Sequence, residues 1–485
     1  MGYATMKLRR FCFVPVIMFL MSVIISPCLA QSLPSTNGRV EYVENEYLKL
    51  GVDLSLGGAV TVLIDKQRDE RNLINSHDWG RQVQMSFYSG PKPYIPPNGQ
   101  QPNERWAQLG WNPIQSGDVG GHRSQLLEYE NDGEAIYVRC VPMHWPHVNV
   151  PGECTFESTY RLNGNAVEAT CVLNNARPDE TQYQGQSQEL PAVYTNGPWY
   201  KLVTYVGDRP FEDEPLSVLV DKDDDRGWPW LHYYAPEHWA ALVDDEDVGL
   251  GVYQPASSDF LGGFHGGDES KGQGGEKNGQ TGYISPLSQE VLDHNIRYEY
   301  EYALIAGSLD DIRQYAYERN DEREDAGHPR YVFESDRSQW ILRRTTDAGW
   351  PIEGELAASL NPGAPSEWIG PKTFWRAENA PRLEIEAAFE PASETSVAAP
   401  LALNVQLTPF APSDLKHSLH WGGPPASNPP RIRVPLTLSP NGEYRVHSID
   451  LTKIEGYEGG MTRIRLAVPP GTGILKVRRI EFLGP

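Results

Sequence analysis

Short stretches of alternating apolar and polar residues, each ended by Gly, Asn, Asp or Pro, recur along the chain and limit its fold more than any other feature. They are rich in Val, Tyr, Thr and Phe, which pack well on a pleated surface. Successive side chains of a strand point to opposite faces, so each stretch can bury one face and solvate the other. The sequence therefore predicts antiparallel strands, in the first half at residues 40–52, 59–64, 83–88, 134–141, 155–162 and 166–173.

One hairpin and one helix are also expected. The dipeptide Asn163-Gly164 separates two of these stretches, and it readily adopts the positive φ values that a two-residue turn demands. Ser308 precedes apolar residues that recur near a helical period, which predicts a capped helix at 308–320.

This helix marks the boundary between two β domains. A charged stretch at 319–328 follows it, and a chain of 485 residues is longer than one hydrophobic core usually organises. We expect a first domain at residues 38–320 and a second, a β-sandwich of the jelly-roll kind, at 331–485. Strand-like runs of the second domain are at 382–389, 401–407, 444–451, 464–468 and 474–482.

The first 30 residues have the pattern of a signal peptide. Lys7, Arg9 and Arg10 form a cationic start, and a small-x-small cleavage site ends at Ala30. The apolar run at 11–25 is shorter than the ~18–20 residues that span a bilayer. We expect cleavage after Ala30 and a secreted or periplasmic protein without stable membrane insertion.

The chain is strongly acidic and sparing in cysteine. Its formal net charge is −23 and no cluster of Lys and Arg occurs along the sequence, which argues against nucleic acid and anionic membranes as partners. Cys140, Cys154 and Cys171 remain after processing and lack metal-ligand spacing. We expect buried thiols or one disulfide, and no metal or other cofactor.

Two further segments are expected to be loops. Residues 259–281 are rich in glycine and poor in apolar side chains, which predicts a long loop. The acidic runs at 221–225 and 244–247 lack the spacing of a calcium-binding hand, so solvated turns are expected there.

The region 72–265 holds groups suited to sugar recognition. Tryptophans and histidines are frequent in it, and aromatic faces stack on sugar rings while charged and amide groups bond the hydroxyls. Large β domains also bury tryptophan, which is the competing explanation. The predicted substrate-binding residues are Arg81, His122, Arg123, Trp145, Trp199, Trp230 and Trp239.

Several short segments resemble a known superfamily. The segment Asn72-Leu73-Ile74 runs into Asp78-Trp79-Gly80-Arg81 and a strand, after a Gly-Gly-Ala-Val turn at Gly57. This arrangement resembles the galactose-mutarotase-like supersandwich of aldose epimerases and of many glycoside hydrolases and polysaccharide lyases. The resemblance covers residues 38–306 and implies an all-β fold, a large antiparallel supersandwich followed by a smaller β-sandwich. It also implies an epimerase acid at His144 or His147 and a base at Glu189 or Glu237, although the pattern around the epimerase histidine is not evident.

Cleavage of a polysaccharide or oligosaccharide by hydrolysis is the favoured function. A glycosidase needs one protonated carboxylic acid and a second carboxylate. Glu189 and Glu237 each have apolar and aromatic neighbours in the sequence, which would raise the pKa of a carboxyl. They are the predicted pair, and Asp78 and Asp118 are further candidates.

Two alternatives stay open. A lyase acting on a uronic acid would use a base such as His147, His122 or Tyr194, with Arg81 or Arg123 against the carboxylate. A non-catalytic glycan-binding protein needs neither. The predicted catalytic residues are thus Glu189, Glu237, His147 and Tyr194.

The second domain has two readings. Its tryptophans could line a glycan-binding face, or the domain could be purely structural. The tryptophans in question are Trp350, Trp368, Trp375 and Trp421.

Overall fold

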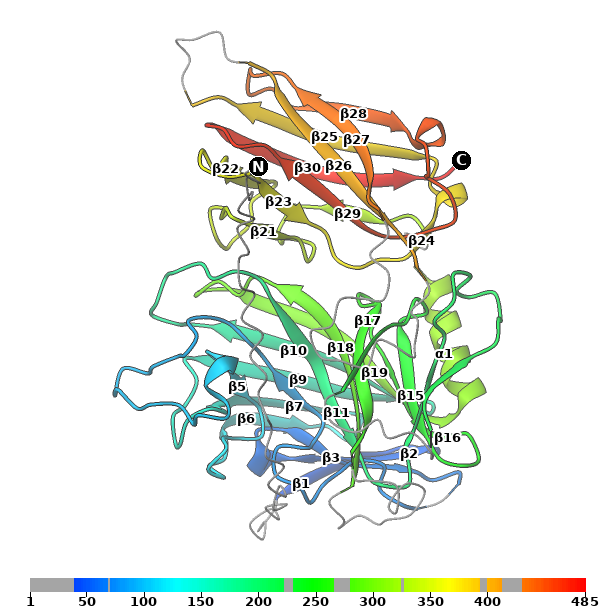
Figure 1. The fold of residues 1–485 in the computed structure, drawn as a ribbon. Helices are drawn as coiled ribbons and strands as arrows, with labels where there is room; N and C mark the ends of the chain where they lie inside the picture. The colour runs from blue at the N-terminus through cyan, green and yellow to red at the C-terminus, as the bar shows by residue number, and fades with distance from the viewer. Residues whose placement is uncertain are drawn as a thin grey trace, which may run out of the picture.

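The computed structural model describes residues 39–68, 70–221, 230–265, 280–323, 327–392, 399–411 and 430–485. The described chain is built of strands with a single α-helix, α1 (Leu309–Asp321), so the predicted all-β class is confirmed (Figure 1). The expected signal peptide at 1–30 and most of the acidic run at 221–225 lie outside these residues. No helix in the described part of the chain is long and apolar enough to cross a membrane.

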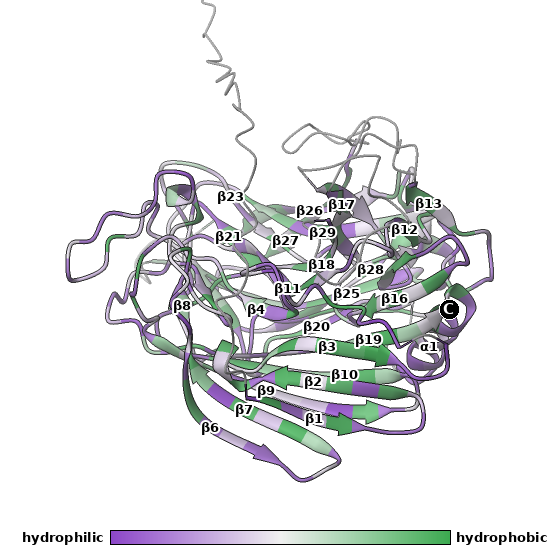
Figure 2. Ribbon diagram, turned by 90° about the horizontal axis from the view of Figure 1, so that it is seen from below, coloured by the Kyte–Doolittle hydropathy of each residue, from purple (hydrophilic) through white to green (hydrophobic). Residues whose placement is uncertain are grey.

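The first domain contains a nine-stranded antiparallel sheet in the order β13-β12-β15-β16-β19-β10-β9-β7-β6. Its strands are β6 (Gln125–Asn131), β7 (Ala135–Val141), β9 (Cys154–Asn163), β10 (Ala166–Asn175), β12 (Lys201–Thr204), β13 (Ser217–Val220), β15 (Trp239–Val243), β16 (Val248–Tyr253) and β19 (Arg297–Ser308). In Figure 2 the alternation of hydrophobic and hydrophilic residues is visible along β6, β7, β9 and β10.

A seven-stranded sheet in the order β14-β17-β18-β11-β4-β5-β8 packs against it. Its strands are β4 (Gln84–Ser86), β5 (Pro113–Ile114), β8 (Met143–His144), β11 (Gln186–Thr195), β14 (Leu231–Tyr234), β17 (Asp259–His265) and β18 (Thr281–Glu290). A three-stranded sheet of β1 (Val40–Glu44), β2 (Leu48–Asp53) and β3 (Ala59–Asp65) completes the domain.

One hydrophobic core joins the first-domain sheets. Phe156 of β9, Tyr302 of β19 and Phe260 of β17 are among its buried residues. Helix α1 lies on β15, β16 and β19, where Ile312 and Ala316 are fully buried. The helix begins as the sequence predicts, because the hydroxyl of Ser308 accepts a hydrogen bond from the Asp311 amide in a capping box.

The second domain is a sandwich of two sheets around its own core. One sheet holds β20 (Arg330–Val332), β22 (Leu356–Ser359), β25 (Arg382–Glu390), β28 (Arg445–Asp450) and β30 (Ile474–Leu483). The other holds β21 (Ile341–Arg343), β23 (Ser366–Ile369), β24 (Trp375–Arg376), β26 (Leu401–Pro409), β27 (Ile432–Leu438) and β29 (Gly460–Val468).

A buried ion-pair network joins the two domains. Arg337 lies 2.6 Å from Asp293 of the first domain and 2.6 Å from Asp347 of the second, and all three side chains are at most 5% exposed. Beside it, Val291 of the first domain packs on Ile341 and Ile369 of the second. The domains therefore share a tight, partly charged interface.

Two local predictions need correction. The predicted hairpin forms, but Asn163 pairs with Ala166, so the turn residues are Gly164 and Asn165 with positive φ at Gly164. The predicted loop at 259–281 begins as strand β17, because Phe260 and Phe264 bury themselves in the core; residues 266–279 lie outside the described chain.

The structure also shows the state of the cysteines and the positions of the second-domain tryptophans. The three thiols left after processing are free and buried, so the possible disulfide is not formed. Trp368 and Trp375 lie in the second core and cannot line a binding face, while Trp350 packs against the first-domain core. Trp421 lies outside the described residues.

Candidate functional site

Polar and aromatic side chains gather on the outer face of the seven-stranded sheet. Met85 and Ile284 point into the core, so their neighbours Ser86 of β4 and Tyr283 of β18 point outward. The outward positions of a strand normally carry polar groups in water, yet Tyr283 is only 1% exposed, because other aromatic rings cover it.

An irregularity in β11 brings two predicted residues to this face. Glu189 and Tyr194 are five positions apart, and a regular strand would place them on opposite faces. The register against β18 shifts between Glu189 and Val193, and both Leu190 and Val193 point into the core. As a result Glu189 and Tyr194 share the outer face.

Glu189 lies among tyrosines. The hydroxyl of Tyr88 donates a hydrogen bond to its Oε2 at 2.9 Å, and the hydroxyl of Tyr283 lies close enough to act on the carboxyl without forming a regular hydrogen bond. Burial raises the pKa of Glu189 above its ordinary value, and the two tyrosine hydroxyls counteract part of that rise. Glu189 is therefore a carboxyl that holds its proton to higher pH than a solvated one.

A charged group adjoins Glu189 and Tyr194. Burial and the charge of Glu189 raise the pKa of Tyr194, while Arg81 lowers it, so the three groups lie within electrostatic reach. Arg81 donates to Oδ2 of Asp78 at 3.1 Å. Burial and the charge of Arg81 lower the pKa of His265, at the end of β17.

An aromatic platform forms the next part of the face. The indole of Trp230 stacks on Tyr283 with ring centroids 4.9 Å apart and planes 23° from parallel. Tyr283 in turn contacts Tyr194 at 4.6 Å. Gly263 lies under Trp230, where an added Cβ would come within 3.3 Å of the indole. Such a platform suits the C–H face of a sugar ring.

Trp145 lies beside the Arg81 loop. An added Cβ on Gly80 would come within 2.7 Å of its indole, so the ring packs directly on the backbone next to Arg81. Trp145 also contacts Trp106 edge to face at 6.2 Å. The outer-face site is thus defined by Arg81, Tyr88, Trp145, Glu189, Tyr194, Trp230, His265 and Tyr283, with Asp78 behind Arg81.

Glu237 does not belong to this site. Its carboxylate is fully buried and binds Arg313 of α1 through two hydrogen bonds of 2.9 and 3.1 Å. It also accepts hydrogen bonds from Tyr317 and from the indole of Trp239. A carboxylate saturated in this way anchors the helix, and the predicted pairing of Glu189 with Glu237 is wrong.

His147 is not placed to act as the predicted catalytic residue. It is 1% exposed, and burial together with the charge of His144 lowers its pKa. The neighbouring His144 forms a hydrogen bond of 3.0 Å with Glu153. The carboxylate of Glu153 also accepts a hydrogen bond from the indole of Trp111. This buried cluster holds two strands and a loop together, so a base role for either histidine is contradicted by its burial.

The remaining predicted residues are structural or lie apart. Trp199 and Trp239 are at most 3% exposed and belong to the core. His122 bonds Asp118, whose carboxylate also accepts from loop amides, and Arg123 bonds Ser55. Asp118 therefore braces a loop.

Sequence reasoning missed Tyr88 and Tyr283, and it did not single out His265. The alternation of Ser86 and Tyr88 with Met85 and Phe87 was the available signal for the first. Nothing in the local sequence of Tyr283 distinguishes it from a core residue.

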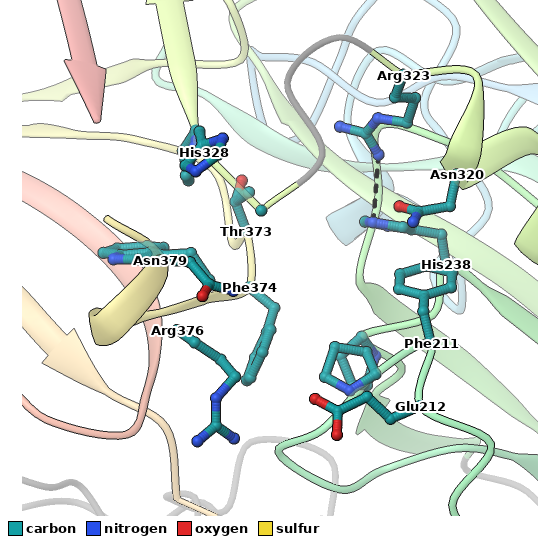
Figure 3. Close-up of a pocket in the computed structure, with 15 residues that line it drawn as sticks. Phe211, Glu212, His238, Asn320, Arg323, His328, Thr373, Phe374, Arg376 and Asn379 are labelled. Carbon is teal, nitrogen blue, oxygen red and sulfur yellow. Dashed lines mark hydrogen bonds between the residues drawn. The ribbon is translucent and has the colours of Figure 1, made fainter. Parts of the chain in front are cut away.

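A cavity of about 220 Å³ lies at the domain junction, away from this face (Figure 3). Phe211, His238 and Arg323 line it from the first domain, and Phe374 and Arg376 from the second. Its polar groups are largely engaged, since His238 bonds the Ser257 carbonyl and Arg323 bonds the Pro255 carbonyl. Of the predicted residues, none lines it.

Galactose mutarotase-like proteins and an α-galactosidase are among the solved structures that this chain resembles. A galactose mutarotase-like protein from Lactobacillus casei is 11% identical with a TM-score of 0.34, over 55% of this chain and 99% of that one. A galactose mutarotase related enzyme from Lactobacillus acidophilus is 12% identical with a TM-score of 0.35, over 56% and 97%. An α-galactosidase from Geobacillus stearothermophilus is 11% identical with a TM-score of 0.34, over 59% and 43%.

These likenesses concern the fold alone, and they are to the group that the sequence resemblance named. No protein-family model matches the chain, and no curated protein matches it. The function is therefore argued from the residues of the outer-face site.

Proposed function

We propose that the protein hydrolyses glycosidic bonds of a polysaccharide or oligosaccharide at the outer-face site, with Glu189 as the general acid. The observation that carries this proposal is the raised pKa of Glu189 beside the Trp230–Tyr283 platform. Protonating the leaving oxygen requires a carboxyl that keeps its proton near the working pH. A sugar stacked on Trp230 would present its glycosidic oxygen to this group.

Asp78 is the second carboxylate of the proposal. Its Oδ2 is fixed by Arg81 at 3.1 Å and by Asn75 at 3.0 Å, while its buried Oδ1 lies 3.5 Å from His77 and forms no hydrogen bond with the described residues. Asp78 is only 3% exposed, so its part in the proposal is to hold Arg81 in place and to stabilise positive charge at the anomeric carbon from behind that residue.

Elimination is less well supported than hydrolysis. A lyase base must give up its proton readily, whereas burial and Glu189 raise the pKa of Tyr194. Tyr194 then serves as a hydrogen-bond donor to substrate. The signal-peptide pattern supports action outside the cytoplasm, where polymeric glycans are available.

The test uses the chain without its first 30 residues on neutral and uronic-acid polysaccharides. We expect new reducing ends without near-ultraviolet absorbance, and a rate at least about 100-fold lower for Glu189→Gln. Glu301→Gln, at an exposed position on β19, is the matched control and keeps the parent rate.

Two results would contradict the proposal. Products that absorb in the near ultraviolet would show elimination in place of hydrolysis. An unchanged rate in Glu189→Gln would remove the assigned acid, and unshortened polymers with intact binding would show a purely glycan-binding protein.

A further inference from the structure

Five arginines share the outer face of the six-stranded sheet of the second domain. Leu342, Val434, Ile464 and Leu466 point into the core, so the arginines that alternate with them point outward. The five are Arg343 of β21, Arg431 just before β27, Arg433 of β27, and Arg463 and Arg465 of β29.

The strand register places these guanidinium groups close together. Gln406 of β26 pairs with Arg433 on one side and with Arg465 on the other. Arg463 lies two residues farther along β29, opposite Thr408. The sequence shows no basic cluster because the five positions are spread over 120 residues, and only the sheet assembles them.

Carboxylates do not balance this face. Glu367 lies 3.4 Å from Arg431, and no carboxylate within the described residues forms an ion pair with the other four arginines. Asp259 of the first domain acts on Arg463, but His232 and Lys372 already hold it at 2.6 Å each.

The opposite sheet shows the contrast. There Arg330 lies 3.4 Å from Glu481, Arg479 lies 3.7 Å from Glu384, and Arg478 lies 3.6 Å from Glu386. Cations on that sheet are matched by carboxylates on neighbouring strands. The arginine face is therefore a local excess of positive charge in a chain whose net charge is −23.

Some hydrogen-bonding groups on the arginine face lack partners, although Arg431 bonds Gln406 at 2.9 Å. Within the described part of the chain, the Nε atoms of Arg463 and Arg465 are buried and have no hydrogen-bond partner, and the same holds for Oγ1 of Thr408. Burial and the charges of Arg431 and Arg463 lower the pKa of Arg465 to about 10. An unsatisfied, mutually repelling set of guanidinium groups gains from an oxyanion, which accepts several N–H bonds at once.

We propose that the arginine face binds an acidic glycan through the carboxylate or sulfate groups of its sugars. This inference rests on the proposed function, because it assigns the class of polymer that the first domain would cleave. Arg463 adjoins Asp259 of β17, a strand of the sheet that carries the outer-face site. One extended chain could therefore contact both domains.

The test measures binding apart from cleavage, on the chain without its first 30 residues. Dextran sulfate, alginate and unmodified dextran are the probes, by calorimetry at low and at moderate salt. We expect dextran sulfate or alginate to bind and dextran to bind at least about tenfold more weakly, since each lost charge-assisted contact changes affinity by about that factor. The two polyanions separate sulfate from carboxylate recognition.

Two variant pairs locate the site. One variant combines Arg463→Gln with Arg465→Gln, and the other combines Arg343→Gln with Arg433→Gln at exposed positions. We expect each double variant to bind polyanions at least about tenfold more weakly and to show a smaller salt dependence of binding. Arg330→Gln with Arg382→Gln, on the opposite sheet, removes the same charge and leaves binding unchanged.

Three outcomes would overturn the assignment: equal loss in the opposite-sheet pair, unchanged binding in both arginine-face pairs, or single-stranded DNA binding as tightly as the acidic glycans. Glu301→Gln, exposed on β19 and outside both sites, is expected to bind polyanions like the parent. A protein that binds acidic glycans but does not cleave them would refute the hydrolase and leave the arginine face standing.

Discussion

At the scale of single residues, two buried glutamates show how environment sets the behaviour of a carboxyl. Glu189 lies among tyrosines and forms no ion pair with any described residue, whereas Glu237 is paired with Arg313 and accepts several hydrogen bonds. Burial therefore raises the pKa of Glu189, whereas Glu237 is held in a buried ion pair. Both glutamates have apolar neighbours in the sequence. The difference between them comes from Arg313, which is 76 residues from Glu237 in the chain and bonds it in the fold.

The pH dependence of activity follows from the tyrosines around Glu189. Tyr88→Phe removes a hydrogen bond that stabilises the carboxylate, so the pKa of Glu189 rises further. A general acid is active while protonated, and its activity is lost as pH rises through its pKa. We expect the alkaline limb of kcat/KM to move to higher pH, measured on a polysaccharide that the parent cleaves. A downward shift would contradict the acid role.

Glu290 makes stability depend on pH. Burial raises its pKa to about 7, and the hydroxyls of Ser288 and Tyr298 donate hydrogen bonds to it. Because the folded pKa lies above the ordinary value, stability is full below about pH 4 and falls as pH rises toward 7, by about 3 kcal/mol in total.

Glu290→Gln is expected to remove this loss. Its free energy of unfolding should exceed that of the parent at pH 8 and approach it at pH 4, in urea titrations at both pH values. Glu301→Gln, exposed on β19, serves as the control and should follow the parent curve. A Gln variant less stable than the parent at pH 8 would contradict the assignment.

At the scale of strands, the aromatic platform depends on β14, β17 and β18 together. Trp230 precedes β14, Gly263 of β17 leaves room beneath it, and Tyr283 of β18 supports it. Trp230→Ala removes one stacking surface and should raise KM about tenfold with little change in kcat, since a ring pair contributes about 0.5–1.5 kcal/mol. Steady-state kinetics test this, with Tyr42→Ala at the exposed edge strand β1 as control. Equal KM values would remove Trp230 from the site.

The strands also show how far sequence reasoning reaches. Turn residues, alternation and the cap at Ser308 predict the strands and the helix, because these signals act between neighbours along the chain. The site depends on the irregular β11, which turns Glu189 and Tyr194 to one face against the rule of alternation. Likewise, no local pattern distinguishes Trp199 in the core from Trp230 on the surface.

At the scale of the whole molecule, Arg337 couples the two domains. Arg337→Met leaves Asp293 and Asp347 buried without their cation, which should cost about 3–5 kcal/mol. Calorimetry is expected to show a lower Tm and two separate transitions in place of one. Arg344→Met, which is exposed nearby, should behave like the parent. A single unchanged transition in Arg337→Met would mean that the domains unfold together for other reasons.

The three unpaired sulfhydryl groups in β7, β9 and β10 can report how often the nine-stranded sheet opens locally. Burial raises the pKa of Cys140 and of Cys171 to about 12, so neither is a reactive thiolate while its strand is in place. An alkylating reagent can modify them only during a local opening of the nine-stranded sheet. The rate of alkylation would therefore measure the frequency of local opening of this sheet without any introduced label.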